Sequence, residues 1–196
     1  MEITSLSQLD FNGSYTYADY LLWKFTERVE LLKGRIFKLA APSRRHQTVA
    51  GNLHIQLGNA LWKNPCKVYV APFDVRLTKF SSAKNTEVTT VVQPDLCVIC
   101  DPLKLDDKGC IGAPELVIEI LSPGNSRTEL KDKFELYQEN GVLEYWIVNP
   151  TDNVIQVWNL SDDGILLNAA PFLEGDTITT PLIPNLQLSV SDAFMD

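Results

Sequence analysis

The chain has 196 residues, of which 45% are hydrophobic and 21% charged, and its formal net charge is −8. This profile suits one globular domain over residues 1–196 and argues against a nucleic-acid binder that is held by charge alone. No apolar stretch approaches the roughly 20 residues of a membrane span, and the polar start MEITSLSQLDFNGS lacks the regions of a signal peptide, so we expect a cytoplasmic protein without membrane contact.

The N-terminal part of the chain predicts a short helix, a hairpin and a long helix, in that order. Thr16 can cap a short helix that runs to Leu22. The segment VELLKGRIFKLA indicates a hairpin with Lys33 and Gly34 in the turn. Ser43 can cap a helix that runs to about Trp62. Its apolar residues keep a helical spacing at Val49, Leu53, Leu57, Ala60 and Leu61.

Basic residues gather in this same part of the chain. Seven Lys or Arg residues and two acidic residues lie from Lys24 to Arg45. The segment therefore predicts either a basic face on an otherwise acidic molecule or a solvated strand edge.

The rest of the chain predicts mostly strands, with one further helix. KVYVAPFDVRL supplies one or two strands, residues 78–90 form a loop or hairpin tip, and QPDLCVIC is a strand that follows Pro94. After a loop over 101–114, PELVIEILSP is a buried strand, and a helix runs from about Ser126 to Asn140, where Gly141 ends it. LEYWIVNP and NVIQVWNL then form a hairpin, and the tail is rich in β structure. We expect an α/β (α+β) fold with a central mixed sheet flanked by helices, a core over about 28–150 and a C-terminal β extension over 151–196.

The four cysteines show no spacing that is typical of a disulfide framework. Cys97 and Cys100 form one C-x-x-C within an expected strand, where a separation of three residues places the side chains on opposite faces. We therefore expect small core residues at these positions and no zinc site.

Glu119 lies inside the apolar run of the PELVIEILSP strand. A buried carboxylate without a partner costs several kcal/mol, so this residue needs a compensating group. Asp95 begins the neighbouring expected strand, and the two carboxylates can converge if the strands lie side by side. Two such groups resist joint ionisation, and Mg²⁺ or Mn²⁺ would resolve the conflict. The alternatives are that Asp95 caps a turn and that Glu119 pairs with an arginine.

The helix after this strand supplies a lysine on its apolar side. At about 100° per residue, Lys133 falls inside the arc of Leu130, Phe134, Leu136 and Tyr137, whereas Lys131 falls on the polar side. Lys133 therefore points either toward Glu119 as part of a metal-and-lysine site or along the apolar surface with its ammonium group in solvent.

These features together resemble the PD-(D/E)XK nuclease superfamily. More narrowly, the chain resembles the Uma-two family of restriction endonucleases, long known as a domain of unknown function, over nearly its whole length. The motifs that carry the resemblance stand in order: VELLKGRI, the S-x-x-H of Ser43 to His46, QPDLCVI, ELVIEILSP and KFELYQENGVLEYWIVNP.

The resemblance implies a restriction-endonuclease-like core and Mg²⁺- or Mn²⁺-dependent hydrolysis of DNA phosphodiester bonds. Asp95 and Glu119 would be metal ligands, joined by the backbone carbonyl of Ile120. The superfamily usually places its lysine two residues after the acid, which is Leu121 here, and this family instead supplies Lys133, which would orient or deprotonate the attacking water or contact the phosphate. 

Two accessory residues have open roles. Glu30 matches an acidic position of the family and either supports the metal ligands or is a surface strand residue. His46 either meets a phosphate at the start of the long helix or forms a local hydrogen bond there.

Two other functions remain as alternatives at this point. A catalytically degenerate relative would bind nucleic acid or a protein partner without cleaving it, and a different metal hydrolase would use the same carboxylates on a small substrate. We also expect a homodimer, because duplex DNA suits a symmetric pair of sites and because the tail and the strands of Trp146 and Trp158 are more apolar than one small domain needs.

Overall fold

A computed structural model describes residues 2–80, 82–122 and 127–196, and its centre is a six-stranded mixed sheet. The order of the strands is β12-β11-β10-β9-β6-β3, in which only the β10–β9 pair is parallel. The bounds are Lys67–Val70 for β3, Leu96–Ile99 for β6, Leu116–Ile120 for β9, Glu144–Asn149 for β10, Val154–Leu160 for β11 and Leu166–Asn168 for β12. The expected mixed α/β fold is confirmed.

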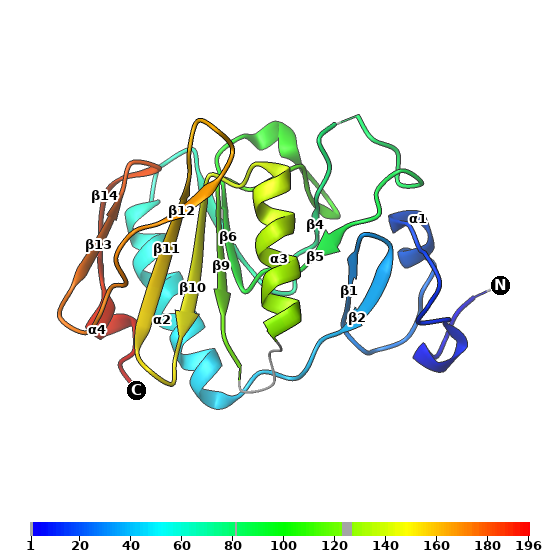
Figure 1. Ribbon diagram of the computed structural model, residues 1–196, viewed down its shortest axis with the longest axis horizontal. Helices are drawn as coiled ribbons and strands as arrows, with labels where there is room; N and C mark the ends of the chain where they lie inside the picture. Colours follow the sequence, from blue (N-terminus) through cyan, green and yellow to red (C-terminus); the bar gives the residue numbers. More distant parts are fainter. Residues whose placement is uncertain (1, 81, 123–126) are drawn as a thin grey trace.

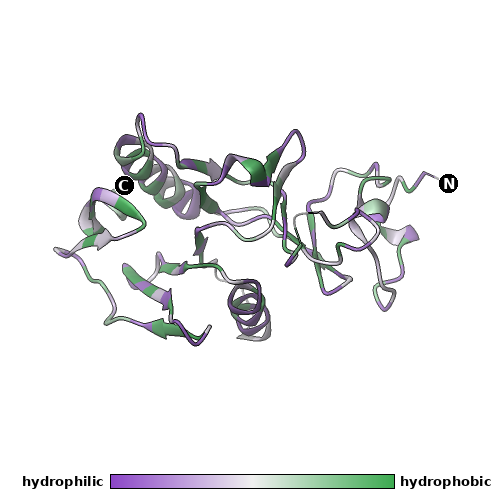
Figure 2. Ribbon diagram, turned by 90° about the horizontal axis from the view of Figure 1, so that it is seen from above, coloured by the Kyte–Doolittle hydropathy of each residue, from purple (hydrophilic) through white to green (hydrophobic). Residues whose placement is uncertain are grey.

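Two long helices cover the two faces of this sheet, as Figures 1 and 2 show. Helix α2 (Arg44–Ala60) packs Val49, Leu53 and Leu57 against one face, and α3 (Arg127–Asn140) packs Leu136 and Tyr137 against the other. Ser43 caps α2 as predicted, since its Oγ accepts a hydrogen bond from the His46 amide at 3.2 Å. The expected start of the second helix at Ser126 lies outside the described residues.

Side chains along the central strands point alternately to the two faces of the sheet, and this decides which of them pack against α2 and which against α3. Leu116, Ile118 and Ile120 of β9 belong to the core under α2, whereas Val117 belongs to the core under α3. Glu119 faces the same side of the sheet as Val117, because successive strand residues face opposite sides and these two are two positions apart. Glu119 is therefore directed toward α3.

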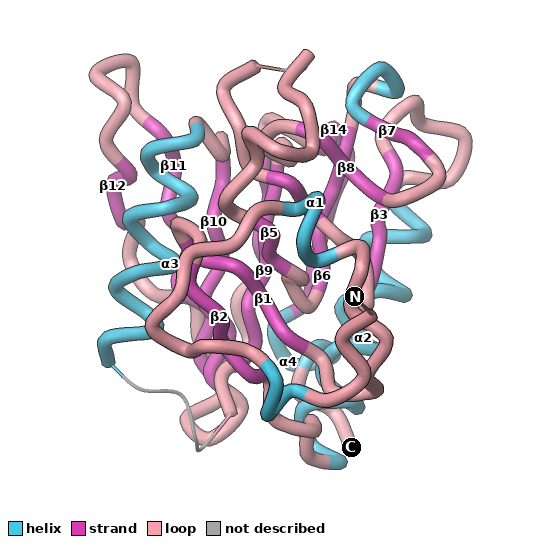
Figure 3. The backbone as a smooth tube through the Cα atoms, turned by 90° about the vertical axis from the view of Figure 1, so that its right-hand side faces the viewer, coloured by secondary structure: helices cyan, strands magenta, loops and turns pink. Residues whose placement is uncertain are grey.

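A second six-stranded sheet, in the order β2-β1-β5-β4-β8-β7, joins the N-terminal part of the chain to the core. It includes the predicted hairpin, whose turn residues Lys33 and Gly34 both have positive φ. Figure 3 shows this part of the chain facing the viewer, with the short helix α1 (Tyr17–Tyr20) beside it. The strands are β1 (Val29–Leu32), β2 (Arg35–Lys38), β4 (Val75–Arg76), β5 (Val91–Val92), β7 (Leu105–Asp106) and β8 (Gly109–Ile111). Short 3-10 turns occupy Leu6–Gln8 and Pro102–Lys104.

The tail folds back onto α2. Strands β13 (Thr177–Thr180) and β14 (Ile183–Ser189) form a two-stranded sheet, and the chain ends after the short helix α4 (Val190–Ala193). Ile178, Ile183 and Leu188 are fully buried in the same core as Leu53 and Leu57.

Two predictions of local structure need correction. Residues 101–114, expected as a loop, contain β7 and β8, because β8 pairs with β4 of the second sheet. Cys100, directly after β6, is bonded to Cys66, directly before β3, so within the C-x-x-C only Cys97 is the free, buried core residue that we expected. The two partners are 34 residues apart, and no spacing motif connects them.

The helices in the described ranges are all too short or too polar to cross a membrane. A disulfide is uncommon in cytosolic proteins, so the cytoplasmic location stays a prediction.

Candidate active site

Asp95 and Glu119 converge at one edge of the central sheet. Strands β6 and β9 are antiparallel neighbours with Leu96 opposite Ile118, so Asp95, one residue before β6, lies at the end of β9 that carries Glu119. The amide of Ile120 donates a hydrogen bond to Asp95 Oδ2 at 2.8 Å. The convergence that the sequence predicted is therefore present.

Lys133 is the buried partner of Glu119. Its Nζ lies 2.9 Å from Glu119 Oε1 and 3.1 Å from Glu30 Oε2, and Tyr137 Oη donates to the same Glu119 oxygen at 2.6 Å. Lys133 is 5% exposed. The predicted inward direction of Lys133 is confirmed, and the alternative of an arginine partner for Glu119 does not apply.

The helix places the second lysine elsewhere. Lys131 keeps 74% of its side chain exposed and lies 3.6 Å from Glu135, one turn along the same helix. The helical-wheel prediction therefore separated the two lysines correctly.

The charges of this cluster depend strongly on one another. Burial raises the pKa of Glu119 to about 7, although the nearby Lys133 ammonium opposes this shift. Burial alone would lower the pKa of Lys133, but the carboxylates of Glu119 and Glu30 hold that pKa above its ordinary value. Lys133 is thus a cation at neutral pH, shared between two carboxylates.

His46 and Glu30 both contact the cluster. His46 Nε2 lies 3.1 Å from Asp95 Oδ2, and although burial lowers the pKa of the imidazole, this hydrogen bond raises it above its usual value overall. Glu30 is 1% exposed and also accepts a hydrogen bond from the Gln93 amide at 2.7 Å. Glu30 is therefore not a surface residue, and the ring of His46 is turned toward Asp95, while its backbone makes the local bond to Ser43.

Each carboxylate of the pair has one oxygen without a partner in the described part of the chain. Among the described residues, Asp95 Oδ1 and Glu119 Oε2 accept no hydrogen bond, because the contacts of these residues all go to Oδ2 and Oε1. The same part of the chain holds no cluster of three or more His, Cys, Asp or Glu side chains arranged to hold a metal. A divalent ion here would therefore need backbone or water ligands besides the two carboxylates, which is the coordination that Mg²⁺ prefers.

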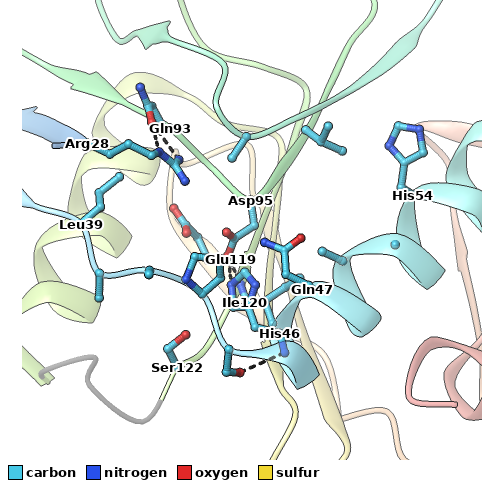
Figure 4. A pocket seen from close by; sticks show the side chains of 18 of the residues that line it. Arg28, Leu39, His46, Gln47, His54, Gln93, Asp95, Glu119, Ile120 and Ser122 are labelled. Carbon is cyan, nitrogen blue, oxygen red and sulfur yellow. Dashed lines mark hydrogen bonds and ion pairs between the residues drawn. The ribbon is translucent and has the colours of Figure 1, made fainter. Parts of the chain in front are cut away.

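The cluster opens into a cavity of about 680 Å³ between α2 and the sheet edge. Figure 4 shows His46 and Gln47 of α2 on one side, Asp95, Glu119 and Ile120 at the base, and Arg28 with Gln93 on another side. The sequence analysis did not single out Tyr137, Arg28 or Gln93. The position of Tyr137 could have been predicted, since a residue one helical turn after Lys133 lies on the same face of the helix.

Comparisons with known proteins give a family match and a related fold. Residues 17–191 match the model of the Uma2 family, described as "Putative restriction endonuclease". An uncharacterized protein of Synechocystis sp. is 29% identical over 155 residues, which is 76% of this chain and 77% of that protein. A crystal structure of a "putative nuclease belonging to DUF820" from Anabaena variabilis superposes with a TM-score of 0.71 at 18% identity and covers 92% of this chain and 97% of its own. 

Proposed function

Because the chain belongs to the Uma2 family, we propose that it is a metal-dependent nuclease that hydrolyses phosphodiester bonds of DNA. One observation carries this proposal: two carboxylates from adjacent strands line the same cavity beside a buried lysine, and each has one oxygen that accepts no hydrogen bond from the described residues. The family and the related fold support a nuclease, while the metal and the DNA substrate are our inference from the chemistry of the side chains.

The proposed ion is Mg²⁺ or Mn²⁺, held by Asp95, Glu119 and the backbone carbonyl of Ile120. Hard divalent cations prefer oxygen ligands, and the unpartnered oxygens of the two carboxylates match this preference. When bound, such an ion stabilises negative charge on a phosphate oxygen and lowers the pKa of a bound water.

The side chains around the carboxylates fix their positions. His46 and the Ile120 amide hold Oδ2 of Asp95, and Tyr137 and Lys133 hold Oε1 of Glu119. Fixed donors and acceptors need no reorganisation when charge develops in the transition state. Lys133 is charged at neutral pH, so we assign it to orienting the attacking water or to contacting the phosphate through its N–H groups rather than to removing a proton.

We further propose that the substrate is duplex DNA, that the protein is a homodimer and that it is located in the cytoplasm. Two-fold symmetric DNA suits a pair of identical sites, one for each strand. A location in the same compartment as DNA follows from the proposed substrate.

The direct test is cleavage of single- and double-stranded DNA with Mg²⁺ or Mn²⁺, comparing the wild type with Asp95→Asn and Glu119→Gln. We expect cleavage by the wild type that EDTA abolishes and that both variants lose. We also expect either ion to raise the Tm of the wild type and not that of Asp95→Asn, because a ligand that binds only the native state stabilises it.

Other outcomes would replace the proposal with one of its alternatives. A wild type that binds metal and DNA but cleaves nothing would be a degenerate binding module. Cleavage of a small phosphodiester without cleavage of DNA would indicate a hydrolase with a small substrate.

A further inference from the structure

Arg28 is a half-buried cation in the wall of the cavity, outside the carboxylate cluster. It lies directly before β1 and lines the same cavity as Asp95 and Glu119 (Figure 4). Its Nε and Nη2 atoms donate to Gln93 Oε1 at 3.0 and 2.8 Å. Two hydrogen bonds to one oxygen fix the orientation of the planar guanidinium group.

Gln93 is itself fixed by the N-terminal part of the chain. Its Nε2 donates to Asp74 Oδ1 at 2.9 Å and lies 3.2 Å from Tyr20 Oη, and its backbone amide donates to Glu30 at 2.7 Å. Because carboxylate oxygens accept hydrogen bonds, the amide nitrogen of Gln93 faces Asp74. The amide oxygen is therefore left facing Arg28.

This arrangement holds Arg28 without neutralising its charge. Other buried or half-buried cations of the molecule have acidic partners, such as Arg76 with Asp106 at 2.6 Å and Lys133 with Glu119 at 2.9 Å. Across the ranges that the structure describes, no carboxylate lies within ion-pair distance of Arg28, and its partner is a neutral amide. A positive charge thus lies fixed in the cavity wall, and its remaining N–H groups have no hydrogen-bond partner among the described residues.

We propose that Arg28 binds a backbone phosphate of the nucleic acid beside the Asp95–Glu119 pair, with Gln93 as its positioning residue. This proposal rests on the proposed function for its substrate class. A guanidinium fork matches the geometry of a phosphate group and forms short, charge-assisted hydrogen bonds with it. The exposed Lys38, which lines the same cavity, is a second cation on this side.

The electrostatics of the site explain why such a cation is needed. Glu30 and Glu119 share the single ammonium group of Lys133, and Asp95 is hydrogen-bonded to His46 and to the Ile120 amide. Three carboxyl groups thus lie at or beside the base of the cavity, which disfavours a polyanion there. Arg28 and Lys38 both come from the basic segment that begins at Lys24. That segment therefore supplies at least two cations to one wall of the cavity.

Fluorescence anisotropy with a labelled DNA oligonucleotide tests the proposal in EDTA, where no metal-dependent cleavage interferes. Arg28→Ala should weaken binding about 10-fold and reduce the slope of log K against log salt concentration by about 0.7–0.9, the share of one phosphate contact. The affinity of Arg28→Lys should lie between those of the wild type and Arg28→Ala, because lysine keeps the positive charge but lacks the planar guanidinium group. An oligonucleotide with an uncharged methylphosphonate backbone should not distinguish Arg28→Ala from the wild type.

Arg35→Ala is the matched control, because Arg35 is an exposed arginine of the same hairpin that does not line the cavity. We expect it to change affinity less than 2-fold. Equal losses of DNA affinity in the Arg28 and Arg35 variants would mean that the basic segment attracts DNA only through its overall positive charge. This would overturn the proposal. Unchanged binding by Arg28→Ala, or no binding by the wild type, would also overturn it.

Gln93→Ala tests the positioning role, with its Tm measured to confirm folding. It should lose affinity for the phosphate backbone although every cation is still present, and full affinity would remove Gln93 from the proposal. Wild-type binding without any cleavage would contradict the proposed nuclease function and leave the role of Arg28 intact.

Discussion

Lys133 lies between Glu30 and Glu119, and this position links stability to the proposed chemistry. A buried cation that two carboxylates share cannot be removed without leaving acidic groups close together in a poorly hydrated place. The same ammonium group is the one that the proposed mechanism needs near the phosphate.

Lys133→Ala should therefore have two effects. Turnover should fall by roughly 10²–10³-fold, the usual scale for losing one preorganised hydrogen-bond donor to developing charge, and metal-free stability should fall by about 3–5 kcal/mol, the usual cost of breaking a buried ion pair. Cleavage assays below the lowered Tm and denaturant unfolding in EDTA measure the two effects separately.

Lys131→Ala is the control for this substitution. Its ammonium group is exposed and pairs only with Glu135 on the helix surface, so turnover should hardly change, and stability should fall by about 0.3–0.5 kcal/mol. If Lys131→Ala were inactive and Lys133→Ala active, the assignment of the catalytic lysine would be wrong.

Sequence patterns identified the charged centre of the site but not its supports. Glu119 was visible because a carboxylate interrupts an apolar strand, and Lys133 because it falls on the apolar arc of a helix. Arg28 and Gln93 carry no such signal. Their pairing joins residues 65 positions apart, and it depends on how the N-terminal hairpin docks against the central sheet.

Secondary-structure elements were predictable where local chemistry decides them. The hairpin has its turn at Lys33 and Gly34, where both residues adopt positive φ, and α2 begins at the Ser43 cap. Strands β7 and β8 were missed because they are only 2 and 3 residues long, too short to show an alternating pattern, and because β8 also relies on the distant β4 as a partner. The disulfide of Cys100 has the same origin, since Cys66 meets it only through the pairing of β3 with β6.

Glu144 connects β10 to β13 through a hydrogen bond and has no basic partner in the described part of the chain. It begins β10, accepts a hydrogen bond from Trp146 Nε1 at 2.6 Å and another from the hydroxyl of Thr180 at the end of β13. Burial raises the pKa of the Glu144 carboxyl, and these two hydrogen bonds only partly oppose the shift. The ionised side chain therefore costs stability in the folded protein.

Glu144→Gln should stabilise the protein in a pH-dependent way. Because the carboxyl pKa is higher in the folded than in the unfolded chain, the free energy of unfolding falls as pH rises from about 4 through the raised pKa. Glutamine cannot ionise, so the variant should exceed the wild type by about 1 kcal/mol at pH 8, or roughly 2–4 °C in Tm, and should show no gain near pH 3. 

Thermal unfolding across this pH range measures the effect, with the exposed Glu174→Gln as control. A difference between Glu144→Gln and wild type that is the same at every pH would mean that the Glu144 carboxyl does not titrate as described.

At the scale of the whole molecule, much of the apolar tail is part of the core. Trp146 is fully buried, and Ile178, Ile183 and Leu188 pack with α2. One reason for expecting a homodimer, an excess of apolar tail residues, is thereby reduced to the exposed Ile165, Leu167, Leu173 and Met195. The prediction of a dimer now rests mainly on the symmetry of duplex DNA.

Sedimentation velocity at micromolar concentrations tests the dimer, with and without a short DNA duplex. We expect a dimer at least when the duplex is bound, since two sites are needed to cut both strands together. A single protein chain on each duplex at every loading would contradict the prediction and would favour cleavage of one strand at a time.

The central claim is that Asp95 and Glu119 hold a divalent metal ion in the cavity. Anomalous diffraction from a crystal soaked in Mn²⁺ tests it most directly, because the signal locates the ion independently of any activity. We predict a peak in contact with the carboxylates of Asp95 and Glu119 and with the carbonyl of Ile120, and no such peak in Asp95→Asn. A saturating soak with no peak there, or with Mn²⁺ bound only elsewhere, would contradict the account.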